Sequence, residues 1–251
     1  MSVLVSRHGA TAVVTLDQAA KRNVLSAMLV RAIGSAFDEL EADETVHAVV
    51  LTGAGPAFCA GAELSTLRAA ANGEFESVRE VYDGFLRVLR SPLPTIAAVN
   101  GPAVGAGFNL ALACDIRMAS QKALFDTRFA SLRLHPGGGH TWLLARIVGH
   151  QQAMLASLFG EIWCAERAQE VGLVASVHQP ESLLEAAIAL ARRLDDQEPA
   201  FVRRLTESLR RTPNGTHADA LAHETAAQEW STTRPAFLEG LAAIEARVAR
   251  K

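Results

Sequence analysis

Two glycine-rich segments contain residue types that could bind a carbonyl oxygen. They cover residues 52–64 and 100–109, with the sequences TGAGPAFCAGAEL and NGPAVGAGFN. Each follows a short apolar run and leads into a helical pattern, so unpaired backbone N–H groups with partial positive charge are expected in both. Two such groups directed at one point would form an oxyanion hole, which stabilises negative charge developing on a carbonyl oxygen. Tight strand–helix turns without a ligand would have the same composition, and for either segment alone this alternative stays open.

Other common arrangements of catalytic residues are missing. Residues 53–58 begin like a dinucleotide-binding fingerprint, but Phe58 stands where a third glycine is needed for close helix–strand packing. His223 and Glu224 begin like a zinc-protease motif, but Ala227 replaces its second histidine. The sequence contains no phosphate-binding P-loop and no GxSxG nucleophile elbow. NAD, zinc and serine-hydrolase chemistry are therefore disfavoured.

The elements that must position the two segments alternate between strands and helices. Residue 26, a serine, can cap a helix that runs to about residue 41, and a short helix is expected over 108–113. Strands are predicted over residues 3–6, 11–16, 46–51, 95–99, 116–119 and 171–177. This alternation favours an α/β fold with helices covering the sheet.

Strand signals disappear after about residue 181, and only amphipathic helical patterns follow. These patterns cover residues 182–194, 199–211 and 217–230, and a fourth begins at residue 235. We therefore predict a core over residues 1–195 and a C-terminal helical region over residues 196–251.

The composition limits the class of protein further. The chain has 251 residues, 49% of them hydrophobic, and a formal net charge of −3, which favours a globular core and no nucleic-acid partner. No apolar run approaches the roughly 20 residues of a membrane span, and no secretory leader pattern opens the chain. We expect a cytoplasmic protein with no membrane partner. The three cysteines lack disulfide or metal-ligand spacing, so we expect free thiols and no metal site.

The segments FCAGAEL and AAVNGPAVGAGFNLALACDIRMAS resemble the two signatures of the enoyl-CoA hydratase/isomerase (crotonase) family. The resemblance implies a crotonase-like spiral of ββα units with a helical C-terminal region, assembled as a homotrimer or hexamer. It also implies an acyl-CoA thioester substrate, in which coenzyme A is part of the substrate and no separate cofactor is needed.

The same resemblance assigns roles to individual residues. The backbone N–H groups of Ala62 and Ala106 would form the oxyanion hole. The residues expected near coenzyme A are Lys21, Arg22, Val24, Ala60 and Leu64. A solvated turn is the alternative for Lys21 and Arg22, since single surface charges usually carry little specific meaning. Glu63 is expected to be structural, because an acidic residue is favoured at a helix start.

Both glutamates that activate water in this family are replaced. By the resemblance, the first falls on Asn109 and the second on Phe129. An amide cannot act as a base near neutral pH, although Asn109 could orient a water or a substrate oxygen. General acid–base groups contribute about 10²–10⁴-fold each. We therefore expect weak hydratase activity, and the isomerase reaction that uses the second carboxylate is affected in the same way.

Other side chains could transfer protons instead. The candidates are Tyr82, Asp83, Asp126, His135 and His140. The structural alternatives are a packed ring for Tyr82, an ion pair with Arg128 for Asp126, and a position at a helix start for the two histidines. The first hypothesis is an enolate-stabilising enzyme with an unusual set of proton-transfer groups. The alternative is a non-catalytic acyl-CoA binding protein.

Overall fold

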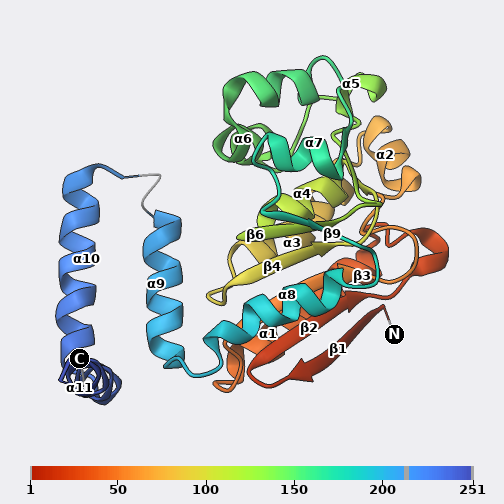
Figure 1. Ribbon diagram of the computed structural model, residues 1–251. Helices are drawn as coiled ribbons and strands as arrows, with labels where there is room; N and C mark the ends of the chain where they lie inside the picture. Colours follow the sequence, from red (N-terminus) through yellow and green to blue (C-terminus); the bar gives the residue numbers. More distant parts are fainter. Residues whose placement is uncertain (1, 212–214, 250–251) are drawn as a thin grey trace. The chain divides into compact units, whose positions relative to one another are not determined.

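A six-stranded sheet forms the centre of the N-terminal part of the protein (Figure 1). The computed structural model describes residues 2–211 and 215–249. The strand order is β1-β2-β3-β4-β6-β9; β1 and β2 are antiparallel and all other neighbours are parallel. The strands are Val3–His8 (β1), Thr11–Leu16 (β2), Ala48–Gly53 (β3), Thr95–Val99 (β4), Ile116–Ser120 (β6) and Ser176–His178 (β9). Every residue of β3 and β4 is buried, as expected for parallel strands covered on both faces.

A second sheet of three short strands lies beside the two glycine-rich loops. It consists of Ala103–Val104 (β5), Leu124–Asp126 (β7) and Trp163–Cys164 (β8). The chain adds one strand to each sheet and then forms a helix: β4 and β5 precede α4 (Ala106–Ala113), and β6 and β7 precede α5 (Phe129–Leu132). This repetition confirms the predicted α/β class and its ββα units.

Helices cover both faces of the large sheet (Figure 1). On one face lie α1 (Ala27–Ala42), α3 (Glu76–Leu89) and α4, and on the other lies α8 (Leu183–Ala191). The remaining helices of this part are α2 (Leu64–Ala71), α6 (His140–Ser157), α7 (Ala165–Glu170) and the short η1 (Ala19–Lys21) and η2 (Arg192–Leu194). As predicted, α1 is capped by Ser26, whose Oγ accepts a hydrogen bond from the Leu29 N–H at 3.3 Å.

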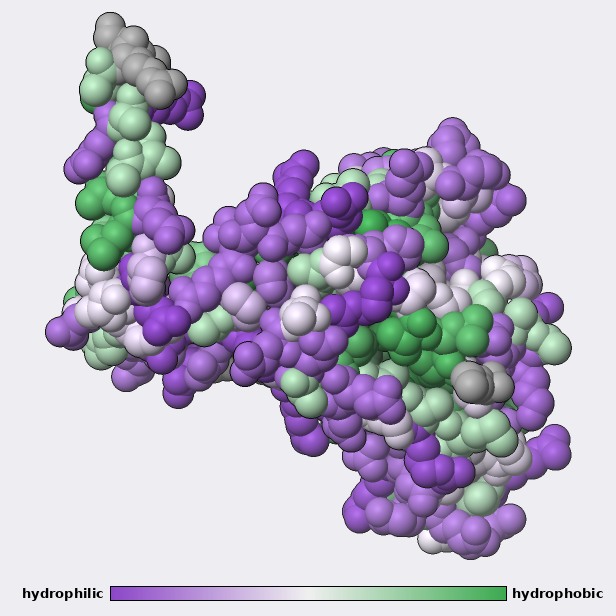
Figure 2. Space-filling view, turned by 90° about the horizontal axis from the view of Figure 1, so that it is seen from below, coloured by the Kyte–Doolittle hydropathy of each residue, from purple (hydrophilic) through white to green (hydrophobic). Residues whose placement is uncertain are grey.

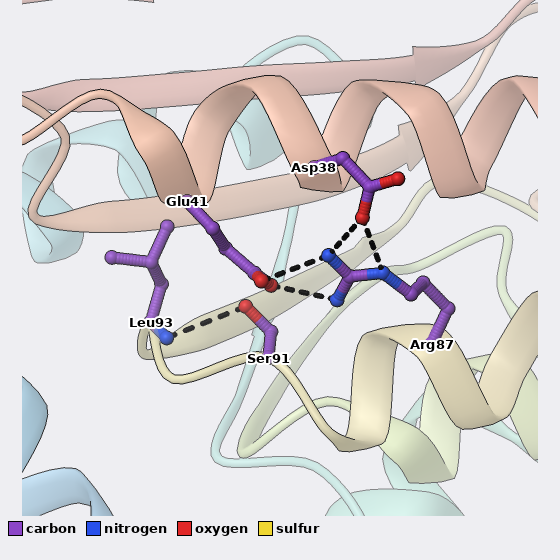
Figure 3. A network of polar contacts seen from close by, with 5 residues as sticks. All are labelled: Asp38, Glu41, Arg87, Ser91 and Leu93. Atoms are coloured by element: carbon purple, nitrogen blue, oxygen red, sulfur yellow. Dashed lines mark hydrogen bonds and ion pairs between the residues drawn. The ribbon is translucent and has the colours of Figure 1, made fainter.

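An ion-pair network joins α1 to α3 (Figure 3). Arg87 on α3 donates to Asp38 at 2.6 Å and to Glu41 at 2.7 Å, both on α1. The two carboxylates raise the pKa of the Arg87 guanidinium, because they stabilise its charged form. Since α3 also carries Tyr82, this network holds one of the candidate residues in place.

Several predicted boundaries are wrong, among them the end of the strand expected over 3–6, which extends to His8. The helix expected over 108–113 begins at Ala106, because the loop before it is shortened by β5. The strand expected over 46–51 begins at Ala48. The strand expected over 171–177 is confined to β9, because Leu173 uses its backbone outside the sheet: its N–H donates to Ala168 and its carbonyl accepts from the buried Arg117.

The chain divides into two compact units between Asp195 and Asp196. The second unit is helical, with α9 (Pro199–Arg211), α10 (His217–Thr232) and α11 (Pro235–Val248). Within it, Thr216 caps α10 and Arg204 lies over the Trp230 ring at 4.3 Å.

Both units expose hydrophobic side chains. Figure 2 shows one face of the molecule, on which a hydrophobic patch lies among mostly hydrophilic residues. Leu221, Leu238 and Ile244, on α10 and α11, are 57%, 59% and 62% exposed. Among the described residues, no helix combines the length and apolar character needed to cross a membrane.

Candidate active site

A cavity of about 680 Å³ lies in the first unit, where both glycine-rich loops end. Its walls come from these loops, from α2, α3 and α5, and from the turn that precedes α6. The lining includes Ala60, Ala62, Leu64, Tyr82, Ala106, Asn109, Arg128, Phe129, His135 and Gly137. None of the residues lining this cavity, within the part of the chain that the structure describes, is an aspartate or a glutamate.

Backbone hydrogen bonds bring the two glycine-rich loops together. The Cys59 N–H donates to the Pro102 carbonyl at 3.2 Å, and the Val104 N–H donates to the Cys59 carbonyl at 3.0 Å. A Cβ atom placed on Gly61 would lie 3.8 Å from the Ala106 nitrogen. The residues before and after Gly61 therefore lie close to the start of α4, and Ala62 and Ala106 line the same cavity.

The start of α4 is set by the conformation of Gly105. This glycine has a φ of 53°, and its N–H donates to the Asp126 carbonyl of β7 at 2.9 Å. Ala106 is the first residue of the helix, where the N–H has no partner within the helix itself. The N–H of Ala106 therefore stands at the positive end of the α4 dipole.

Gly61 is the position at which a side chain would separate the loops. Its φ is 99°, and an added Cβ would lie 2.8 Å from the Val104 carbonyl oxygen. We expect Gly61→Ala to weaken binding of an acyl-CoA roughly tenfold or more, because loop displacement and a positive φ together cost about 1–3 kcal/mol. Isothermal titration calorimetry measures the acyl-CoA affinity of both proteins.

Gly73→Ala is the matched control for Gly61→Ala. Gly73 has a similar φ of 96°, but no atom lies within 4 Å of the position of its added Cβ. Equal affinities in the two folded variants would show that the spacing of the loops does not matter for binding.

Asn109 does not present a free amide to the cavity. It is 2% exposed; its Nδ2 donates to the Gly137 carbonyl at 3.1 Å, and its Oδ1 lies 2.6 Å from Nδ1 of His140. Both ends of the amide are thus used within the protein. These hydrogen bonds speak against the expectation that Asn109 orients a water or a substrate oxygen.

His140 is a neutral, buried histidine. Since Asn109 donates through Nδ2 and accepts through Oδ1, the proton of the imidazole is on Nδ1. Nε2 is buried and has no hydrogen-bond partner among the described residues. Burial lowers the pKa of His140 to about 4. The sequence marked this residue as a candidate for proton transfer, but it is 1% exposed and does not line the cavity.

The low pKa of His140 predicts a loss of stability in acid. The folded value is about 4 and the unfolded value about 6.5, so the unfolded state binds more protons between them. The unfolding free energy should fall by about 3 kcal/mol more between pH 7 and pH 4 in the wild type than in His140→Asn, which does not titrate. Denaturant titrations at both pH values measure the unfolding free energy of each protein. The same pH dependence in the wild type and in His140→Asn would contradict the prediction.

Arg128 and Phe129 form another part of the wall. Phe129 is half-buried, and its ring meets the His140 ring edge-on at 5.0 Å between centroids. Asp126 is paired with Arg128 at 2.6 Å, which is the structural alternative considered for it. Phe129 therefore makes this part of the wall apolar, and the carboxylate of Asp126 is paired with Arg128 outside the cavity lining.

Tyr82 lies on α3 and lines the cavity. A Cβ placed on Gly137 would lie 2.1 Å from its hydroxyl oxygen, so the hydroxyl occupies space that only a glycine leaves open. Burial raises the pKa of the Tyr82 phenol, which keeps it protonated near neutral pH. Near neutral pH, Tyr82 can thus act as a hydrogen-bond donor but not as a base. Its neighbour Asp83, also considered for proton transfer, is exposed and does not line the cavity.

The residues expected near coenzyme A are only partly brought together. Ala60 and Leu64 line the cavity, and the Ala60 N–H donates to the Arg22 carbonyl at 3.0 Å, so the segment around Val24 runs beside the first loop. Lys21 and Arg22 are exposed and do not line the cavity. The ammonium of Lys21 lies 3.7 Å from the Glu63 carboxylate at the start of α2.

Asn23 is a structural residue of this region that sequence reasoning missed. It is fully buried with a φ of 54°, and its Nδ2 donates to the carbonyls of Ala54 and Ala57 at 2.9 Å each. It thereby ties the first loop to the turn before α1. The signal was present, since asparagine tolerates a left-handed conformation better than most residues.

Comparison with known proteins identifies the family. The family model described as Enoyl-CoA hydratase/isomerase matches residues 6–249. This chain belongs to the enoyl-CoA hydratase/isomerase family. It is 42% identical over 252 residues to a probable enoyl-CoA hydratase of Mycobacterium tuberculosis, covering 98% of each chain. It is 38% identical over 192 residues to the 1,2-epoxyphenylacetyl-CoA isomerase of Escherichia coli, covering 74% of this chain and 73% of that one.

Solved structures of the family share the fold. An enoyl-CoA hydratase subunit of Geobacillus kaustophilus superposes with a TM-score of 0.91 at 31% identity, covering 98% of this chain and 96% of that one. An enoyl-CoA hydratase of Bacillus anthracis gives a TM-score of 0.92 at 30% identity, covering 98% and 97%. The family and the crotonase-like fold predicted from the two signature segments are confirmed.

Proposed function

We propose that this protein acts on an acyl-CoA thioester, whose carbonyl oxygen is held by the N–H groups of Ala62 and Ala106. The observation that carries the proposal is that both residues line one cavity at the meeting point of the two loops. Two backbone donors polarise the thioester carbonyl and stabilise an enolate, which forms when the α proton passes to solvent water or hydroxide and negative charge moves from the α carbon to that oxygen. Coenzyme A enters as part of the substrate, and we propose no separate cofactor.

We propose that hydration of an enoyl-CoA is slow. Three features of the described residues support slow hydration. The amide of Asn109 is engaged in hydrogen bonds within the protein, and Phe129 is apolar. No described residue that lines the cavity carries a carboxylate. Tyr82 is the group proposed to donate a proton or hydrogen bond to the acyl part. The reaction therefore depends on carbonyl polarisation more than on a carboxylate base.

Hydration and enolate formation can be tested separately. Crotonyl-CoA hydration, followed by loss of absorbance, should be at least about 10²-fold slower than in a relative with both glutamates. Exchange of the α protons of a saturated acyl-CoA in deuterated water, followed by NMR, should nevertheless be accelerated by this protein. Hydration at the relative's rate would contradict the first expectation.

The alternative of a non-catalytic acyl-CoA binding protein gives a different result in the same experiment. Acyl-CoA would then raise the melting temperature without accelerating α-proton exchange or the turnover of any acyl-CoA. A ligand at 100 times its Kd stabilises by about 2.7 kcal/mol, which a thermal melt detects. Absence of stabilisation and exchange together would exclude both hypotheses.

We further propose that the protein forms a homotrimer or hexamer and resides in the cytoplasm. The exposed hydrophobic residues on α10 and α11, such as Leu221, Leu238 and Ile244, support self-association. Light scattering at several concentrations tests the assembly, and a stable monomer would contradict it.

A further inference from the structure

Asn109 and His140 form a polar contact beside the cavity that proton transfer does not use. His140 Nδ1 donates to Asn109 Oδ1 at 2.6 Å, and Asn109 Nδ2 donates to the Gly137 carbonyl at 3.1 Å. The backbone N–H of His140 donates to the same carbonyl at 3.3 Å. The carbonyl of Gly137 is therefore held from two directions, by a side chain of α4 and by the first residue of α6.

Apolar rings enclose this contact. The Phe108 and Phe129 rings meet the imidazole edge-on, with centroids at 5.7 and 5.0 Å. Asn109 and His140 are 2% and 1% exposed, so water does not compete for their hydrogen bonds. A hydrogen bond shielded in this way is electrostatically stronger than one in water, and leaving either partner unpaired is costly.

The held turn is also the surface on which the tyrosine rests. Added Cβ atoms would lie 2.1 Å from the Tyr82 hydroxyl at Gly137, and 2.3 Å from the Phe85 ring at Gly138. The aromatic side chains of α3 therefore pack directly on the backbone of this turn. A shift of the turn must move the Tyr82 hydroxyl, and Tyr82 is one of the residues that line the cavity.

We propose that Asn109 and His140 are positioning residues, which fix the Tyr82 hydroxyl in the cavity by holding Gly137. This inference rests on the proposed function only for the role of Tyr82 toward an acyl-CoA. The residue at the position of the first missing glutamate would thus act through the backbone rather than on the substrate.

The chain offers a direct probe, because Tyr82 is its single tyrosine. Biosynthetic labelling with fluorotyrosine gives one fluorine NMR resonance that reports on this hydroxyl. In His140→Leu, which has no donor for Asn109, we expect the resonance to shift or split by more than its linewidth. In His140→Asn, whose amide nitrogen can replace Nδ1, we expect the resonance of the wild type to return.

The matched control is His150→Leu. His150 lies on the same helix α6 but is exposed, so its replacement should leave the tyrosine resonance unchanged. Where turnover is measurable, His140→Leu should lower kcat roughly tenfold or more with little change in KM, since small misplacements of a reacting group are costly. A folded His140→Leu protein with the resonance of the wild type would overturn the proposal.

A measurement on the unmodified protein covers the case in which His140→Leu does not fold. NMR of histidine nitrogens should show His140 neutral near pH 7 and protonated on Nδ1. Protonation on Nε2 would overturn the proposal, since Asn109 could not then accept. Acyl-CoA binding to the wild type, measured separately, tests the proposed function, so failure of one inference is distinguishable from failure of the other.

Discussion

Replacing Ala106 by proline should lower turnover of an acyl-CoA, or α-proton exchange, by about 10²–10³-fold. The substitution removes the N–H itself, and with it one of the two donors proposed for the thioester oxygen. Ala106 is the first residue of α4, a position where proline is well tolerated because its φ suits the helix start. The fold should therefore survive, which a circular dichroism melt checks before rates are compared.

Ala106→Gly is the control for this prediction. Glycine keeps the backbone N–H and removes only a methyl group, so most of the activity should remain. If the proline variant is folded and as active as the wild type, the N–H of Ala106 is not a donor to the substrate.

Introducing both carboxylates, Asn109→Glu with Phe129→Glu, should raise crotonyl-CoA hydration by at least about 10²-fold over the wild type. The two positions line the same cavity, so the carboxyl groups would flank one bound substrate. Glutamate at position 109 gives up the hydrogen bonds to Gly137 and His140, and the protein should become less stable. Initial rates from absorbance measure the gain.

A double glutamine variant at the same two positions separates acid–base chemistry from changes of shape. Glutamine has nearly the size of glutamate but cannot act as a base near neutral pH. A similar rate in both variants, or no gain in a folded double glutamate variant, would mean that the cavity differs from that of a hydratase beyond these two positions.

The two halves of the site differ in how they tolerate substitution. The backbone donors proposed at Ala62 and Ala106 need small neighbouring residues and a fixed loop path, and the glycines at positions 61 and 105 provide both. Proton transfer depends on side chains, and the side chain of Asn109 is engaged in hydrogen bonds within the protein. This difference is consistent with the proposed function, in which the protein polarises a carbonyl group but activates water poorly.

The sequence by itself determined the family, the strands of the large sheet and the C-terminal helices. Apolar runs, the cap at Ser26 and the spacing of glycines are local signals, since each depends on neighbouring residues along the chain. The resemblance of the two signature segments also assigns the two glutamate positions of the family to Asn109 and Phe129, and this assignment stays a prediction. Boundaries near positions 106 and 173 were missed, because hydrogen bonds to distant strands decide them.

Only the tertiary structure decided which groups meet in the cavity and beside it. Asn109 and His140 are 31 residues apart in the sequence. Tyr82 contacts Gly137, in the turn before α6, from helix α3. Periodicity indicates which face of a helix is buried, but it does not name the partner of a buried polar group. That partner depends on how successive turns of the spiral stack. This packing made a neutral histidine the partner of Asn109. It also left the described residues that line the cavity without a carboxylate.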